Sequence, residues 1–238
     1  MTPENFVEQI RQVIPTGMQS VILYGSAAAG DHLGKQSDYN LLIVMERLGL
    51  PELKALAAPT QAWVKRGNHP PMLFTMDSLR ESGVTFPIEL LDIRDAHKVL
   101  FGDDLLAGIA ISQINLHRQV EHELHGKLLQ LQSQFLLTGA QSKRIVGLLT
   151  GTLSKFLILF RATLRLYQPT VPVKKFDALQ ELSRHIGFDT SIFMTIQELK
   201  DGRRKVQTVE SDTLFDDYAA AIQTVVNAVN NLAKGTGK

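Results

Sequence analysis

Hydrophobic positions follow two different patterns along the chain, one before about residue 108 and one after it. The first part has short apolar runs separated by polar loops, which is typical of alternating strands and helices. The pattern predicts helices over 3–14, 51–65 and 77–82, and strands over 21–24, 41–44, 72–75 and 87–93. The stretch 94–106 is expected to run from a helix into a glycine turn.

After residue 108 the apolar residues recur at spacings of three and four, which predicts helices to the end of the chain. The expected helices cover 112–137, 141–167, 176–186, 191–199 and 213–233. The second is so apolar that we expect it at the centre of the bundle. The chain is therefore predicted to be α+β, with an α/β domain over 1–107 and an all-α antiparallel helical bundle over 108–238.

The amino-acid composition excludes several kinds of functional site. The 238 residues contain no cysteine, which excludes disulfides, thiolate metal sites and cysteine nucleophiles. No apolar run approaches the roughly 20 residues of a membrane span, and the first residues lack the pattern of a secretion signal. We expect a cytoplasmic protein that does not cross a membrane.

The formal net charge of +1 hides an asymmetry between the two parts. Residues 1–105 carry 9 Lys and Arg against 13 Asp and Glu, whereas residues 106–238 carry 16 against 11. A basic part beside an acidic, metal-binding part would attract a polyanionic ligand, although scattered surface lysines would give the same counts.

One stretch, residues 21–45, carries recognisable chemistry. An apolar run ends at Gly25-Ser26, a polar loop follows, and Asp38 and Asn40 stand two residues apart where the next apolar run begins. Residues two apart on a strand share a face, so both side chains are expected to point toward whatever the Gly25-Ser26 turn holds. A glycine turn lets backbone N–H groups approach a phosphate without a side chain in the way.

This arrangement resembles the signature of the DNA polymerase beta-like nucleotidyltransferase superfamily, in which a Gly-Ser pair is followed by Asp-hydrophobic-Asp at the start of a strand. The resemblance covers about residues 18–103 and implies a mixed sheet flanked by helices. The following bundle resembles the layout of kanamycin nucleotidyltransferase. Two positions depart from the pattern: Asn40 replaces the second aspartate, and Ala29 replaces an arginine found in small members.

The resemblance implies a site. Gly25, Ser26, Ser37 and Asn40 would bind a nucleoside triphosphate, and Asp38 would hold Mg²⁺. A third carboxylate on a neighbouring strand completes such sites, and Glu89, on the strand predicted over 87–93, is our candidate for that catalytic and metal-binding role. Alternatively, Glu89 is an ordinary exposed acid.

The bundle adds further candidates. Arg161 and Arg165 lie within the most apolar helix, where an arginine must be paired or face a cavity, so they predict either a structural ion pair or a phosphate or substrate contact. His117, Glu121 and His125 repeat in steps of four, which fits a metal site or a solvated helix face. Lys174-Lys175 and the run 203–205 are basic clusters that fit RNA contact or solvated loops.

The function that the resemblance implies is transfer of a nucleoside monophosphate from a nucleoside triphosphate to a hydroxyl of a small molecule or protein. Because Asn40 removes a carboxylate, a degenerate site that binds nucleotide or a partner without reacting remains an alternative. RNA binding through the basic bundle is a third, less favoured one. The leucine-rich helices would also suit a homo-oligomer.

Overall fold

The computed structural model describes residues 1–25, 27–28 and 39–235. These residues form two compact units, Met1–Ser112 and Gln113–Lys238. Each unit has its own hydrophobic core, and each is described by itself below.

The first unit is built on a four-stranded mixed sheet. Its strands are β1 (Met18–Tyr24), β2 (Asn40–Met45), β3 (Met72–Thr75) and β4 (His97–Gly102), in the order β3-β2-β1-β4. β1 pairs antiparallel with both β2 and β4, while β2 pairs parallel with β3. The apolar runs that predicted β1 and β2 are buried on both faces, as expected of central strands.

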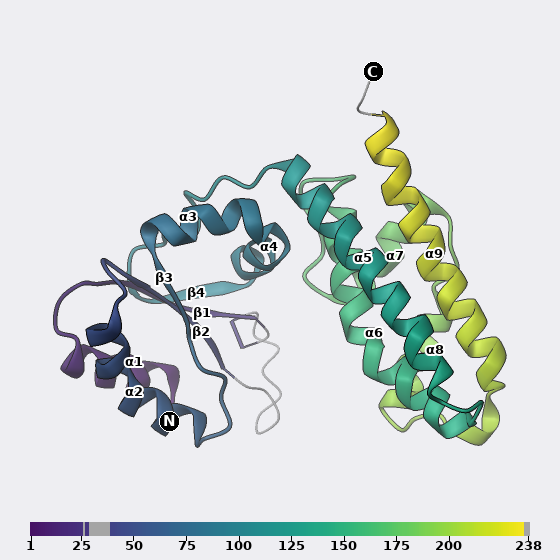
Figure 1. The fold of residues 1–238 in the computed structure, drawn as a ribbon, viewed down its shortest axis with the longest axis horizontal. Helices are drawn as coiled ribbons and strands as arrows, with labels where there is room; N and C mark the ends of the chain where they lie inside the picture. The colour runs from purple at the N-terminus through teal and green to yellow at the C-terminus, as the bar shows by residue number, and fades with distance from the viewer. Residues whose placement is uncertain (26, 29–38, 236–238) are drawn as a thin grey trace. The chain divides into compact units, whose positions relative to one another are not determined.

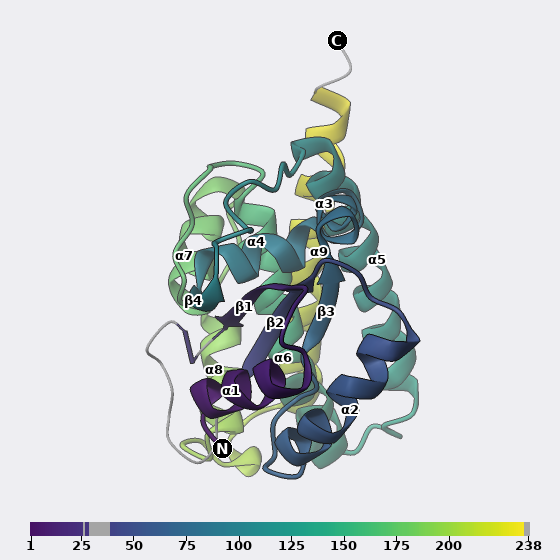
Figure 2. The same cartoon turned by 90° about the vertical axis from the view of Figure 1, so that its left-hand side faces the viewer.

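Helices cover both faces of this sheet (Figure 1). α1 (Pro3–Val13) and α2 (Leu50–Val64) pack on the face formed by Val21, Leu23, Leu41 and Ile43. α3 (Met76–Thr85) and α4 (Pro87–Asp95) lie on the opposite face, and Figure 2 shows the same separation from a second direction. That face presents Ile22, Leu42 and Val44. The strict alternation along β1 and β2 therefore decides which helices each side chain meets.

Trp63 anchors the layer of α1 and α2. Its side chain is fully buried, and its ring centroid lies 4.8 Å from that of Phe6. The indole Nε1–H donates to the carbonyl oxygen of His69 at 2.9 Å, so this large side chain fills the core without leaving its polar atom unsatisfied.

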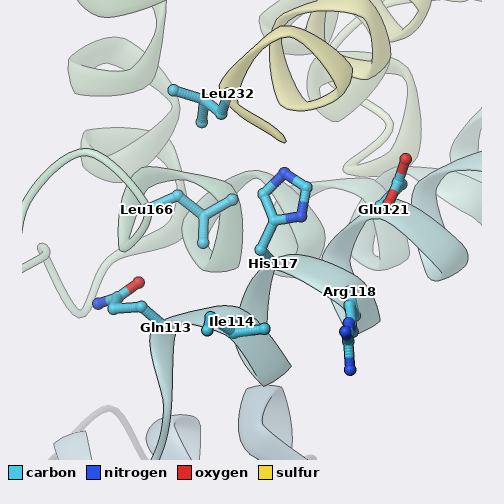
Figure 3. A pocket seen from close by; sticks show the side chains of 7 residues that line it. All are labelled: Gln113, Ile114, His117, Arg118, Glu121, Leu166 and Leu232. Atoms are coloured by element: carbon cyan, nitrogen blue, oxygen red, sulfur yellow. The ribbon is translucent and has the colours of Figure 1, made fainter. Parts of the chain in front are cut away.

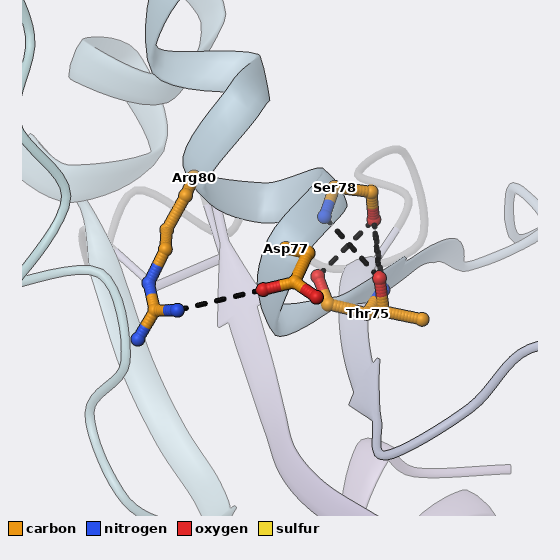
Figure 4. Close-up of polar contacts among 4 residues, drawn as sticks. All are labelled: Thr75, Asp77, Ser78 and Arg80. Atoms are coloured by element: carbon orange, nitrogen blue, oxygen red, sulfur yellow. Dashed lines mark hydrogen bonds and ion pairs between the residues drawn. The ribbon is translucent and has the colours of Figure 1, made fainter.

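The turn from β3 into α3 is fixed by a capping box (Figure 4). The Ser78 backbone N–H donates to Thr75 Oγ1 at 3.2 Å, and the Thr75 N–H donates to Ser78 Oγ at 2.8 Å. Arg80 and Asp77 form an exposed ion pair at 3.5 Å on the first turn. The two hydrogen bonds between Thr75 and Ser78 satisfy backbone N–H groups that the start of the helix would otherwise leave without a partner.

The strand predicted over 87–93 is wrong, because these residues form helix α4. Leu90 and Ile93, three residues apart, pack together on the sheet, and Pro87 stands at the first helical position, where its missing N–H costs nothing. The helix and turn predicted over 94–106 are also wrong in part, since strand β4 occupies His97–Gly102.

The second unit is a helical bundle. Its helices are α5 (Gln113–Leu136), α6 (Ser142–Leu164), α7 (Lys175–Ile186), α8 (Ser191–Lys200) and α9 (Ser211–Gly235), with a short 3₁₀ turn at Val206–Thr208. α6 packs against α5, α7, α8 and α9, which confirms its predicted central place. Its core is aromatic: Phe193 of α8 contacts Phe160 of α6 and Tyr218 of α9 at centroid distances of 5.3 and 5.2 Å.

α6 is long and apolar enough to cross a membrane by length and composition alone. More than half of the qualifying window, 56%, is buried inside the bundle. The core helix of a soluble protein passes the same test, so this helix is weak evidence for a membrane span. No other helix among the described residues meets the test.

Candidate functional site

The end of the sheet where β1 stops and β2 starts brings three side-chain positions into one row. In the strand register, Tyr24 of β1 lies opposite Asn40 of β2 on one side and opposite His97 of β4 on the other. Asn40 is the first residue of β2, in agreement with its predicted place where the second apolar run begins. Ser26, Ser37 and Asp38 lie outside the described residues, so their predicted roles stay predictions.

Gly25 forms the turn that follows β1. Its φ of +81° lies in the left-handed region that glycine adopts without strain, and a Cβ there would come 3.3 Å from Asn40 Nδ2. Its N–H donates to the carbonyl oxygen of Ala96 at 2.9 Å, and its own carbonyl accepts from the Ala28 N–H at 3.0 Å. The Gly25 N–H is thus already used within the protein, and a phosphate at this turn would have to meet other donors.

The polar atoms around Asn40 are tied to neighbouring loops. The Tyr24 hydroxyl lies 3.1 Å from Met72 Sδ of β3, and burial raises the pKa of this hydroxyl above its ordinary value. The Tyr39 N–H donates to Asn68 Oδ1 at 3.2 Å, and the Tyr39 ring lies 6.0 Å from that of Trp63. Among the described residues, this edge therefore has a neutral, partly aromatic lining.

The strand beside β2 supplies no carboxylate. β3 consists of Met72, Leu73, Phe74 and Thr75, and in the parallel register Leu42 lies beside Met72. Continuing that register two residues back from Leu42 to Asn40 leads to Pro70. The nearest acid after β3 is Asp77, which follows the other end of the strand and pairs with Arg80. A third carboxylate on this neighbouring strand is therefore absent.

Magnesium sites for nucleotides rely on several anionic oxygens. The described residues at this strand end offer the neutral amide of Asn40, and no group of three His, Asp or Glu side chains within the described part of the chain is placed to hold a metal ion. Within the described residues, this donor set has too few anionic oxygens for a two-metal site.

Glu89 lies on α4 instead of a strand. Its side chain is exposed, and in a helix it shares a face with Asp92, three residues on, whereas a strand would have pointed the two acids in opposite directions. The strand geometry that favoured Glu89 over Asp92 no longer applies. Its catalytic and metal-binding role remains a prediction.

One polar cluster near the strand end was not anticipated. His97 Nδ1 lies 2.8 Å from the Arg94 carbonyl oxygen, and its Nε2 lies 3.2 Å from Asp104 Oδ2. Burial disfavours the charged form of Asp104, but hydrogen bonds from the His97 side chain and the Leu106 N–H outweigh it and hold the pKa of Asp104 below its ordinary value. No local motif indicates this pair, because His97 is the first residue of β4 and Asp104 follows the end of the strand.

Candidates in the second unit are mostly used by the bundle itself. Arg161 and Arg165 are buried, at 6% and 4% exposure, and Arg161 Nη1 donates to the Val173 carbonyl oxygen at 2.7 Å. His117 Nε2 lies 2.9 Å from the Val229 carbonyl oxygen, and His125 Nε2 lies 3.2 Å from Asn230 Oδ1. The two histidines therefore hold α5 against α9.

The basic loop between α8 and α9 is largely neutralised. Arg203 pairs with Asp201 at 2.8 Å, and Arg204 pairs with Glu198 at 2.8 Å. Two of the three cations in the run 203–205 thus already have anionic partners, which weakens the case for RNA contact there.

The sequence and the structure of the whole chain were compared with those of known proteins. No protein-family model and no curated protein sequence matches it. Among solved structures, spectinomycin adenyltransferase AAD(9) from Enterococcus faecialis, solved with ATP and spectinomycin, is similar at a TM-score of 0.50 and 14% identity over 95% of this chain and 96% of that one. A toxin-antitoxin structure solved with AMP-PNP matches at a TM-score of 0.34 and 14% identity over 55% of this chain and 99% of that one. The mixed sheet flanked by helices and the helical second unit are shared with that adenyltransferase structure, so this chain has the same fold.

Proposed function

We propose that this protein binds a nucleoside triphosphate at the strand end formed by Gly25 and Asn40, and transfers its nucleoside monophosphate to a hydroxyl of a small molecule. The single observation that carries the proposal is the fold, shared over 95% of the chain with an adenyltransferase whose structure holds ATP and spectinomycin. In this reaction the acceptor oxygen bonds to the α-phosphorus while the bond to the β-phosphate breaks and pyrophosphate leaves. We assign Gly25, Ser26, Ser37 and Asn40 to the nucleotide, and Asp38 and Glu89 to catalysis.

A second candidate is a nucleotide-binding module that does not react. The donor set favours it, because Asn40 is neutral and β3 adds no carboxylate. Phosphoryl transfer depends mainly on positioning and on neutralising the charge of the phosphates, so losing acidic ligands lowers the rate while the fold persists.

Restoring the acid at position 40 separates the two candidates. Incubation with labelled ATP, GTP, CTP and UTP, Mg²⁺ or Mn²⁺ and a panel of hydroxylated small molecules measures transfer, and calorimetric titration measures nucleotide binding. If the wild type is an enzyme, it transfers label and Asp38→Asn abolishes this. If the site has decayed, the wild type binds nucleotide without transfer, and Asn40→Asp raises transfer by at least about tenfold.

The matched control is Asn227→Asp, the same chemical change on an exposed position of α9. It should change neither binding nor transfer. Absence of binding to all four nucleotides by a folded wild-type protein would contradict both candidates.

A further inference from the structure

The second unit contains a pocket that the proposed nucleotide site does not use. Its volume is about 500 Å³, within the range of cavities that hold drug-sized ligands. All of its lining residues come from the second unit: the first turns of α5, Leu166 after α6, and Leu232 of α9. Figure 3 shows Leu166 and Leu232 approaching the ring of His117 from different elements.

The walls are mainly apolar. Ile114, Leu166 and Leu232 supply aliphatic surface, and the Ile114 side chain is 66% exposed in the structure. A ligand with an apolar body would remove this surface from water, which stabilises a complex by roughly 25 cal/mol per Å² buried. A densely hydroxylated ligand would gain little from the same walls.

The polar lining consists largely of hydrogen-bond acceptors. The Val229 carbonyl can only accept, so His117 Nε2 donates to it, and Nδ1 of the neutral ring is left as an acceptor. Gln113 Nε2 donates to the Arg165 carbonyl oxygen at 3.3 Å, which leaves the Gln113 Oε1 oxygen as an acceptor. Glu121 adds a carboxylate.

The two charges of the lining differ in exposure. The Glu121 side chain is half-buried, and Arg118 is exposed. Figure 3 shows both on the side of the His117 ring away from Leu166, and in the described part of the chain neither side chain forms a salt bridge or hydrogen bond. A charge partly removed from water interacts more strongly with a ligand than a solvated one, so Glu121 sets the preferred sign.

We propose that this pocket binds an amphipathic organic cation, with a protonated amine donating to Glu121 and His117 and an apolar body against Ile114, Leu166 and Leu232. The site lies entirely in the second unit, and the proposal is independent of nucleotide binding and of transfer.

Three indole probes of similar size and different charge test it: tryptamine is a cation, tryptophol is neutral and indole-3-acetate is an anion. Calorimetric titration at pH 7 should give tryptamine about tenfold tighter binding than tryptophol, the size of effect expected for one partly buried charged hydrogen bond, and indole-3-acetate the weakest. Methyl NMR signals of Leu166 and Leu232 should shift with tryptamine.

Paired variants show whether Glu121 is responsible. Glu121→Gln should weaken the binding of tryptamine about fivefold or more and leave the binding of tryptophol unchanged. Glu123→Gln, on the same helix but paired with Lys127 at 3.8 Å, should change neither. Leu166→Ala should weaken the binding of both tryptamine and tryptophol. Stronger binding of indole-3-acetate than of tryptamine, or equal effects of the two glutamate variants, would overturn the proposal.

Discussion

At the scale of single residues, the candidate site depends on what Asn40 and its neighbours can offer. The sequence correctly placed Asn40 at the start of a strand, because an apolar run following a polar loop is a local pattern. It could not indicate that Tyr24, Asn40 and His97 form a row, since strand register is decided by pairings distant in the chain. For the same reason, the bond that uses the Gly25 N–H was not foreseeable.

Gly102 is required at the end of β4. Its φ is +72°, and a Cβ there would overlap the Gln19 carbonyl oxygen of β1. We expect Gly102→Ala to lower the free energy of unfolding by about 2–4 kcal/mol, from backbone strain and displacement of the strand. Urea denaturation measures this.

Gly126 provides the control for that substitution, because it lies within α5 with nothing near its missing Cβ. Gly126→Ala should raise stability by about 0.5–1 kcal/mol. If the two variants unfolded at the same urea concentration, the close packing of β4 on β1 would be contradicted.

The His97–Asp104 contact predicts a dependence of stability on acid. The pKa of Asp104 is lower in the folded protein than its ordinary value of 3.8. The ionised carboxylate therefore stabilises the fold fully at pH values above 3.8, and this contribution is lost as the pH falls through the lower pKa of the folded state. The Asp104 side chain is 41% exposed, so the effect is small, about 0.2–1 kcal/mol.

Urea denaturation of wild type and Asp104→Asn between pH 2 and pH 6 tests this contribution. The wild type should be more stable near pH 6, and the difference should vanish toward pH 2. A difference that stayed constant down to pH 2 would show that ionisation of Asp104 is not its source.

At the scale of elements, long periodic segments were predicted well and short apolar ones were not. The bundle helices and α1, α2, β1, β2 and β3 agree with the sequence pattern. The prediction of a strand over Pro87–Ile93 was wrong, because seven mostly apolar residues fit a buried strand and a buried helix equally well. The error mattered for the site, since it had placed Glu89 on a strand beside Asp38.

α6 should carry much of the stability of the bundle. Leu153 of α6 is fully buried, whereas Leu136 at the end of α5 is 80% exposed. We expect Leu153→Ala to lower the free energy of unfolding by about 2–5 kcal/mol and Leu136→Ala to change it by less than about 0.5 kcal/mol. Urea denaturation followed by circular dichroism compares them, and equal midpoints would contradict the central place of α6.

At the scale of the whole molecule, the chain consists of two units with separate cores. The likeness to an adenyltransferase covers both, so the bundle is part of the shared fold instead of an appended segment. The sequence indicated this division through its change of hydrophobic period. It could not indicate the pocket between α5, α9 and Leu166, which exists only once these helices have packed.

Separate cores predict separate responses to a core mutation. Leu153→Ala should raise amide hydrogen exchange throughout the second unit and leave the amides of β1 and β2 protected as in the wild type. Hydrogen exchange measured by mass spectrometry resolves the two sets of peptides. Increased exchange in β1 and β2 would show that the two units unfold together.

Trp63 is the single tryptophan of the chain, and it lies wholly within the first unit, fully buried against Phe6 and close to Tyr39. The protein therefore contains one indole fluorophore, which lies in the unit of the candidate nucleotide site. Tyr39 directly precedes Asn40, so an occupant of that strand end that shifts the Tyr39 ring also changes the emission of Trp63. Ligands can thus be screened optically on the unlabelled, unmodified protein.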